Sequence, residues 1–79
     1  MNKKEILEKL SVIFREVLDD DNICLDENTK LNEIAGWDSL QNIHILLSVE
    51  EEFGIRMDVE DSAEIESIDQ LINVIIERV

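Results

Sequence analysis

Several residue types that shape folds are scarce in this chain. Its 79 residues include no proline, two glycines, no tyrosine, two phenylalanines and one tryptophan. Without proline or a low-complexity stretch, no segment is typical of a linker between domains. The length suits one small domain. We therefore expect a single domain that spans residues 1–79.

Cysteines and long apolar runs are also nearly absent. Cys24 is the one cysteine, so no disulfide can form within the chain, and a reducing, cytoplasmic setting is expected. The longest apolar runs, such as 45–47 and 74–76, have three residues, whereas a spanning helix needs about 20. The charged N-terminus is not followed by an apolar stretch. We therefore expect neither a secretion signal nor a membrane span.

Positive charge is the third scarcity. Seven basic residues face twenty acidic ones, which gives a net charge of −13. Four of the basic residues lie within the first fifteen positions, so residues 16–79 hold 18 acidic and 3 basic side chains. Such a surface repels a phosphate backbone, so nucleic acid is not an expected partner. Proteins with basic docking patches are expected partners, because attraction between opposite charges speeds their encounter. Solubility alone would equally explain the charge.

Apolar residues recur at helical spacing from the N-terminus onward. The first helix has one apolar face, and Asn2 can cap it with Glu5 as the return partner. Its apolar residues are Ile6, Leu7, Leu10, Ile13, Phe14, Val17 and Leu18. A long connection from about Asp19 to Trp37 follows. Its apolar residues are expected to hold it against the core, because unanchored loops of this length are unusual. They are Ile23, Leu25, Leu31 and Ile34.

The second half of the sequence predicts the remaining helices. One helix is expected from Asp38, which can cap it, to Phe53, with Gly54 as the stop. A short helical turn is expected around 58–63. Ser67 and Gln70 have capping-box spacing at the start of a last helix, whose stripe is Ile68, Leu71, Ile72, Ile75 and Val79. The predicted fold is therefore all-α: a small antiparallel bundle of three main helices plus one short helix, with a long first loop.

The second helix has more apolar residues than one core face requires. At about 100° per residue, one side carries Ile45, Leu46, Val49 and Phe53. Another side carries Leu40, Ile43 and Leu47, bordered by His44, Glu50 and Glu51. A small bundle can bury both stripes. Alternatively, the second stripe is partly exposed and contacts other proteins, as exposed apolar patches tend to do.

Ser39 lies in the first turn of that helix. Free backbone N–H groups and the helix dipole favour a negative group there, so a phosphodiester on Ser39 would be well placed. Serine is also common at helix starts for structural reasons alone, and position by itself favours this structural interpretation.

A family resemblance favours the first interpretation. The run Gly36-Trp37-Asp38-Ser39-Leu40, an apolar-rich helix and then Glu50-Glu51-Glu52-Phe53-Gly54 resemble the centre of acyl carrier proteins, over nearly the whole chain. The resemblance implies that Ser39 carries 4′-phosphopantetheine, transferred from coenzyme A by a phosphopantetheinyl transferase. It also implies that acyl intermediates are held as thioesters on this arm.

The resemblance further implies a partner-binding surface. Its candidate residues are Asp38, Leu40, Ile43, His44, Leu47, Glu50 and Glu51. Expected partners are acyl-activating, acyltransferase or ketosynthase enzymes with basic docking patches, and the carrier itself is expected to be a monomer. The sequence departs from fatty-acid-synthesis carriers at Gln41 and His44, where those carriers usually have acidic residues. The pathway is thus fatty-acid, polyketide or another specialised acyl transfer.

Two other functions remain open at this stage. A carrier of aminoacyl or peptidyl groups shares the arm, although such carriers usually approach the serine through glycines rather than through Trp37-Asp38. An unmodified acidic interaction module of helices is the alternative of another class.

Catalysis and metal binding are not expected. His44 lies about 140° around the helix from Ser39 and is not placed to be its base, and the motif lacks the second glycine of a nucleophile elbow. A calcium loop starting at Asp19 would need glycine and glutamate where Cys24 and Lys30 stand.

Overall fold

A computed structural model describes residues 2–79 except for the side chain of Val59. Four α-helices and one short 3₁₀-helix follow one another in this part of the chain. They are α1 (Lys3–Leu18), the 3₁₀-helix η1 (Leu31–Glu33), α2 (Ser39–Phe53), α3 (Val59–Glu64) and α4 (Ile68–Arg78). The all-α fold with three main helices, one short helix and a long first loop is confirmed.

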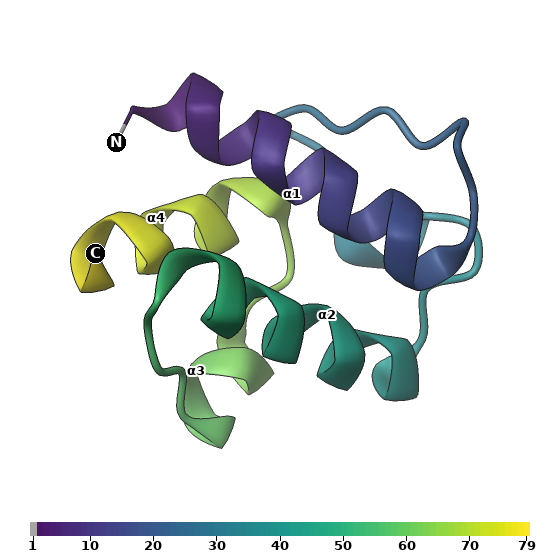
Figure 1. Ribbon diagram of the computed structural model, residues 1–79. Helices are drawn as coiled ribbons and strands as arrows, with labels where there is room; N and C mark the ends of the chain where they lie inside the picture. Colours follow the sequence, from purple (N-terminus) through teal and green to yellow (C-terminus); the bar gives the residue numbers. More distant parts are fainter. Residues whose placement is uncertain (1) are drawn as a thin grey trace.

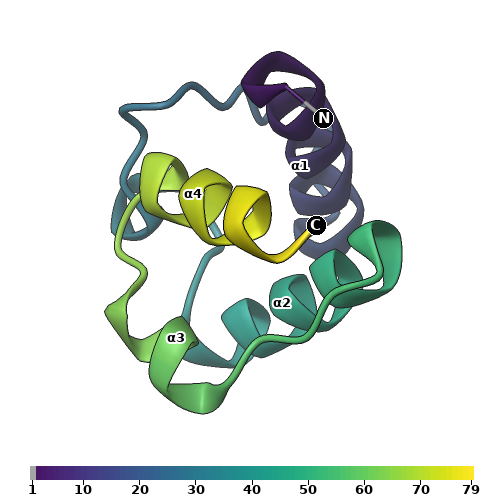
Figure 2. The same ribbon diagram turned by 90° about the vertical axis from the view of Figure 1, so that its left-hand side faces the viewer.

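The helices form a bundle in which α1 runs opposite to α2 and α4 (Figure 1). The short α3 lies on the side of the bundle away from α1. In Figure 2 it is below α4 and to the left of α2. The loop between α1 and α2 passes along the outside of the bundle before it returns to α2 (Figure 1). None of the helices in residues 2–79 is long and apolar enough to cross a membrane.

The helix ends follow the predicted capping residues. The Asn2 side chain accepts a hydrogen bond from Glu5 N at 2.8 Å, and α4 begins with a capping box of Ser67 and Gln70. Gly54 ends α2 with φ +65°, and its N–H donates to the Glu50 carbonyl. A left-handed C-cap of this kind suits glycine, because glycine has no Cβ to clash there.

One predicted capping detail differs. The return contact at α1 joins two side chains, Asn2 Nδ2 to Glu5 Oε1 at 3.4 Å, and does not use the backbone N–H of Asn2. The short helix also begins one residue later than predicted, at Val59, because Asp58 is its cap.

The core lies where the three long helices meet. Each long helix contributes four fully or largely buried side chains: Ile6, Leu10, Ile13 and Phe14 from α1, Ile45, Leu46, Val49 and Phe53 from α2, and Ile68, Leu71, Ile72 and Ile75 from α4. The prediction that Val79 continues the α4 stripe is wrong. Val79 follows the last helical residue and is 57% exposed.

The long loop is held to the core as predicted. Ile23, Leu25 and Leu31 are buried, and Ile34 packs against the core. Backbone hydrogen bonds also join the loop to the start of α4: Leu31 N donates to the Glu66 carbonyl, and Ile68 N donates to the Thr29 carbonyl, each at 2.9 Å. The loop therefore forms one wall beside the α3–α4 connection.

Arg78 joins α4 to the segment around α3. Its Nη2 lies 2.6 Å from Asp61 Oδ2, and its Nη1 donates to the Arg56 carbonyl at 2.7 Å. Asp61 Oδ2 also accepts a hydrogen bond from Asp58 N at 3.1 Å. The Asp58 N–H and the Arg78 guanidinium together hold the pKa of the Asp61 carboxyl below its usual value of 3.8. Both donors favour the charged carboxylate.

The lowered pKa of Asp61 predicts a pH-dependent contribution to stability. Because the folded-state pKa lies below the unfolded one, this contribution is present above about pH 3.8 and is lost as the pH falls through the folded-state pKa. We expect Asp61→Asn to melt at a lower temperature than the wild type at pH 6. This difference should disappear as the pH falls below 3.8.

Thermal melts of both proteins between pH 2 and pH 7, followed by circular dichroism, measure this difference. Asp69→Asn is a matched control for removing one surface charge, because Asp69 makes a longer ion pair of 3.7 Å with Lys3. A difference between wild type and Asp61→Asn that stays constant with pH contradicts the prediction.

Candidate functional site

Ser39 is the first residue of α2, and its side chain is exposed. The Asp38 carboxylate caps the helix by accepting a hydrogen bond from Gln41 N at 2.8 Å. The N–H groups of Ser39 and Leu40 have no carbonyl within the helix to bond, because they lie in its first turn. An anion covalently bound to Ser39 would therefore meet free donors and the positive end of the helix dipole.

The approach to Ser39 has a defined turn. Gly36 has φ +86°, a conformation that glycine adopts readily. Trp37 then packs against the core while remaining partly exposed. Its indole Nε1 donates to Asn42 Oδ1 at 3.3 Å. This hydrogen bond joins the segment before the serine to the next turn of α2 and so holds the start of the helix in place.

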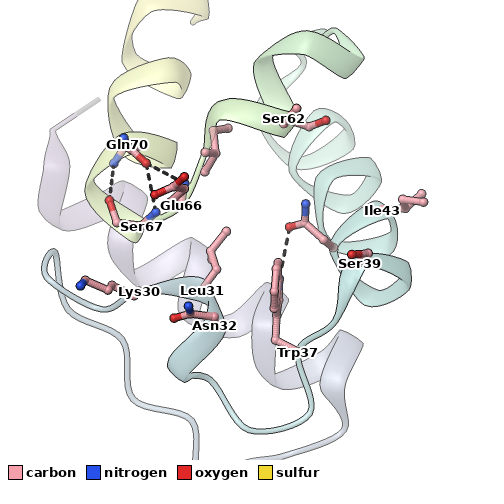
Figure 3. A pocket seen from close by; sticks show the side chains of 13 residues that line it. Lys30, Leu31, Asn32, Trp37, Ser39, Ile43, Ser62, Glu66, Ser67 and Gln70 are labelled. Carbon is pink, nitrogen blue, oxygen red and sulfur yellow. Dashed lines mark hydrogen bonds between the residues drawn. The ribbon is translucent and has the colours of Figure 1, made fainter.

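A cavity of about 840 Å³ lies beside Ser39. Figure 3 shows it bounded by η1 and the residue before it, by the start of α2, and by the segment from α3 to α4. Trp37 stands between the loop wall and Ser39 in this view. The thirteen residues that line it are Lys30, Leu31, Asn32, Trp37, Ser39, Asn42, Ile43, Ser62, Ala63, Ile65, Glu66, Ser67 and Gln70.

The two apolar sides of α2 differ in burial. The side with Ile45, Leu46, Val49 and Phe53 is buried. The other side remains in solvent, with exposed fractions of 63% for Leu40, 57% for Ile43 and 56% for Leu47. We call these three residues the exposed stripe. The predicted exposure of the second side is confirmed, because the core is already filled by the first side together with α1 and α4. Its contact with other proteins stays a prediction.

Charge along α2 is uneven. After the cap residue Asp38, the helix has no acidic residue until Glu50. His44 and Leu47 line a shallow hollow with Val17, at the end of α1. His44 and Glu51 are exposed, while Glu50 is partly buried. Beyond Asp38, the border of the exposed stripe thus holds no carboxylate until Glu50 and Glu51 at its far end.

The structure brings the predicted site residues onto one helix face and its N-terminal end. His44 is exposed, is not among the residues that line the cavity with Ser39, and has no hydrogen bond to it among the interactions of residues 2–79. The same residues hold no group of three or more His, Cys, Asp or Glu side chains arranged to bind a metal ion.

Sequence analysis missed the cavity walls outside α2. Lys30, Leu31 and Asn32 come from the loop, and the residues from Ser62 to Gln70 come from the opposite side. Their spacing in the sequence gives no signal of proximity, because long-range backbone hydrogen bonds bring them together. Cys24, also in the loop, is exposed.

The fold and the site define a small helical bundle with an exposed serine at a helix start, beside a cavity. Comparisons with known proteins identify the family. Residues 8–75 match the family model described as phosphopantetheine attachment site. The chain is 30% identical over 74 residues to the acyl carrier protein of Thermotoga maritima, covering 94% of this chain and 91% of that protein.

Other relatives agree. The chain is 38% identical over 78 residues to acyl carrier protein 5, chloroplastic, of Arabidopsis thaliana, and covers 98% of itself and 55% of that protein. It thus spans about half the length of this relative. The crystal structure of the acyl carrier protein from Thermotoga maritima superimposes with a TM-score of 0.87 at 28% identity, covering 99% of this chain and 91% of that one.

A second solved structure, the holo acyl carrier protein from Geobacter metallireducens in solution, has a TM-score of 0.82 at 30% identity over 91% of this chain and 83% of that one. The chain therefore belongs to the acyl carrier protein family. Members of this family bear a covalent 4′-phosphopantetheine group and are carriers rather than catalysts.

Proposed function

We propose that this protein carries acyl intermediates as thioesters on a 4′-phosphopantetheine arm attached to Ser39. The observation that carries the proposal is the exposed Ser39 hydroxyl at the start of α2, next to a cavity of about 840 Å³. An arm at this position has both solvent on one side, where partner enzymes reach it, and a cavity on the other. Residues 1–79 act as a single carrier domain in this proposal.

The residues around Ser39 fit the group chemically. The phosphodiester would be held by Ser39 Oγ and lie near the free N–H groups of the first helical turn. Asp38 caps the helix through a different N–H, that of Gln41, so capping and phosphate binding do not compete. When bound, the arm supplies a terminal thiol that forms the thioester.

Attachment is a group transfer catalysed by another protein. The Ser39 oxygen replaces adenosine bisphosphate on the phosphorus of coenzyme A and loses its proton. In the proposal this chain is the substrate of the transferase and not itself an enzyme, since no hydrogen bond joins the Ser39 hydroxyl to a carboxylate or imidazole among the interactions of residues 2–79. His44, the one histidine, is absent from the residues around the cavity with Ser39.

Intact mass spectrometry tests this function. The purified protein is incubated with coenzyme A, magnesium and a broad-specificity phosphopantetheinyl transferase. We expect a mass increase of one phosphopantetheine group on the peptide that contains Ser39. No increase would refute the carrier function and favour an unmodified interaction module. Loading the holo form with acyl-activating or aminoacyl-activating enzymes then separates an acyl carrier from an aminoacyl carrier.

The proposed docking surface is the exposed stripe with its borders. Leu40, Ile43 and Leu47 would enter an apolar recess of the partner, since exposed apolar patches of this kind mark interaction sites. The polar border comprises Asp38, His44, Glu50 and Glu51. Partners are the transferase and acyl-activating, acyltransferase or ketosynthase enzymes, with basic groups opposite Glu50 and Glu51.

The proposed pathway is fatty-acid, polyketide or another specialised acyl transfer. The first half of α2 has no carboxylate after Asp38, and Gln41 and His44 stand beside the exposed stripe, which favours a specialised pathway among these. If a partner placed basic groups near Ser39, Asp38 would be the one carboxylate at this end of α2 to pair with them. The protein is proposed to act as a monomer, and its single cysteine favours a reducing compartment such as the cytoplasm.

The exposed stripe should contribute directly to partner binding. We expect Leu47→Ala to raise the KM of phosphopantetheine transfer to Ser39 about tenfold and to leave the melting temperature nearly unchanged. Truncating a leucine that is buried in a complex loses about 1.5 kcal/mol or more, and each 1.4 kcal/mol corresponds to a factor of ten. Initial rates at varied carrier concentration measure the change.

Ile76→Ala is the matched control, because Ile76 is an aliphatic residue of α4 that is 39% exposed. It should leave the KM within about twofold. An equal rise in both variants would argue against a specific stripe, and an unchanged KM in Leu47→Ala would remove this residue from the surface.

A further inference from the structure

The hydrogen bond between Trp37 and Asn42 determines which end of the Asn42 side chain is available at the cavity. An indole nitrogen carries a hydrogen and can only donate. The Asn42 oxygen must therefore be the atom that faces Trp37 Nε1, 3.3 Å away. This hydrogen bond fixes the orientation of the amide.

The amide nitrogen of Asn42 is the end of the side chain that remains available for a further hydrogen bond. Asn42 lines the cavity together with Ser39 and is only partly buried. None of the hydrogen bonds found within residues 2–79 uses its Nδ2 group. A side chain held through its oxygen, with two N–H groups unused, presents donors to whatever enters the cavity. Its complement is an oxygen acceptor such as a carbonyl.

The surroundings of Asn42 suit an oxygen-bearing ligand better than a purely aliphatic one. Eight of the thirteen residues that line the cavity are polar. The Trp37 ring forms an apolar wall beside Ser39 (Figure 3). The Gln70 oxygen cannot serve as a further acceptor for a ligand, because it already accepts from Glu66 N and Ser67 N at 2.6 and 3.2 Å.

Asn42 is also within reach of a group bound to Ser39. The two residues are three positions apart on α2, so their Cβ atoms are neighbours at about 5–6 Å on one helix face. An arm that leaves Ser39 Oγ and folds back over one turn passes Asn42. The 4′-phosphopantetheine arm contains two amide carbonyls, and an acyl cargo can add a further oxygen near the thioester.

We propose that Asn42, oriented by Trp37, is a specificity-determining hydrogen-bond donor that binds a carbonyl oxygen of the arm or of an oxygen-bearing acyl group in this cavity. The proposal rests on the carrier function above and names the ligand chemistry of the same site. The carbonyl has two sources, the pantetheine amides and the cargo, and the forms compared in the experiment distinguish them.

The experiment follows the Asn42 side-chain amide by NMR in four forms of the ¹⁵N-labelled protein: apo, holo, hexanoyl and 3-oxohexanoyl. Intact mass first verifies loading, so a failure of loading counts against the carrier function and not against Asn42. A downfield shift of the Asn42 amide protons already in the holo form identifies the arm as the source. A shift that requires the 3-oxohexanoyl form identifies the cargo.

An unchanged Asn42 amide in all loaded forms overturns the proposal. An equal shift in the hexanoyl and 3-oxohexanoyl forms without any in the holo form identifies the thioester carbonyl, which both forms share, as the acceptor.

Asn42→Asp provides a second, independent measurement. The carboxylate is nearly isosteric and still accepts from Trp37, so the indole N–H signal should persist, but it has no donor for a carbonyl. Nuclear Overhauser contacts between the arm and the Trp37 ring, the one tryptophan, should fall about fivefold, as expected for one lost hydrogen bond. Gln41→Glu adds the same charge at the neighbouring position, outside this cavity, and should retain the contacts. Equal contacts in wild type and Asn42→Asp would overturn the proposal.

Discussion

Replacement of Ser39 by alanine is expected to abolish covalent attachment of phosphopantetheine while the fold is retained. The Ser39 hydroxyl is exposed and does not cap α2, since Asp38 does so. Alanine is also a better helix former than serine. The variant should therefore melt within about 1 °C of the wild type or slightly above it, and any loss of modification reports the missing oxygen. The measurement is intact mass after incubation with coenzyme A and the transferase.

Ser48→Ala is the matched control, because Ser48 lies on the same helix but away from its start. It should gain one arm at the wild-type rate. A mass increase that persists in Ser39→Ala would place the attachment elsewhere, and peptide mapping of the modified protein would then find the true residue. The predicted difference is complete loss against full retention, which is larger than any effect expected at the docking surface.

Phe14→Ala is expected to remove about half or more of the stability of the fold. Phe14 in α1 is fully buried where α1, α2 and α4 meet. Truncating a buried phenylalanine costs about 3–5 kcal/mol, because apolar contacts are lost and a cavity remains. A domain of this size has a free energy of unfolding of about 4–12 kcal/mol at the usual stability per residue. The urea midpoint should therefore fall by about half or the protein should be unfolded in buffer.

Val12→Ala on the same helix is the control, since Val12 is 48% exposed. Its urea midpoint should stay close to that of the wild type, because exposed substitutions usually change stability by less than about 0.5 kcal/mol. Similar midpoints for Phe14→Ala and wild type would mean that α1 does not pack against α2 and α4 as described.

Much of the fold could be predicted from local chemistry. Asn2, Asp38 and Ser67 lie at helix starts because their side chains replace a missing backbone acceptor. Gly54 ends α2 because it adopts a left-handed conformation. These features depend on neighbours within four residues, which the sequence displays directly. Val79 shows the limit of such reasoning: its spacing continues the α4 stripe, but its side chain is exposed.

The candidate site likewise has features that follow from the local sequence and features that depend on tertiary structure. The chain by itself determined that Ser39 opens an apolar-rich helix behind Asp38, and family resemblance supplied the meaning of that position. Tertiary structure alone decided that Leu40, Ile43 and Leu47 stay exposed, because α1 and α4 have room for one side of α2 only. It likewise decided that a cavity adjoins Ser39 and that Trp37 orients Asn42. The loop and the α3–α4 connection, more than 30 residues apart in sequence, meet through backbone hydrogen bonds that no local pattern encodes.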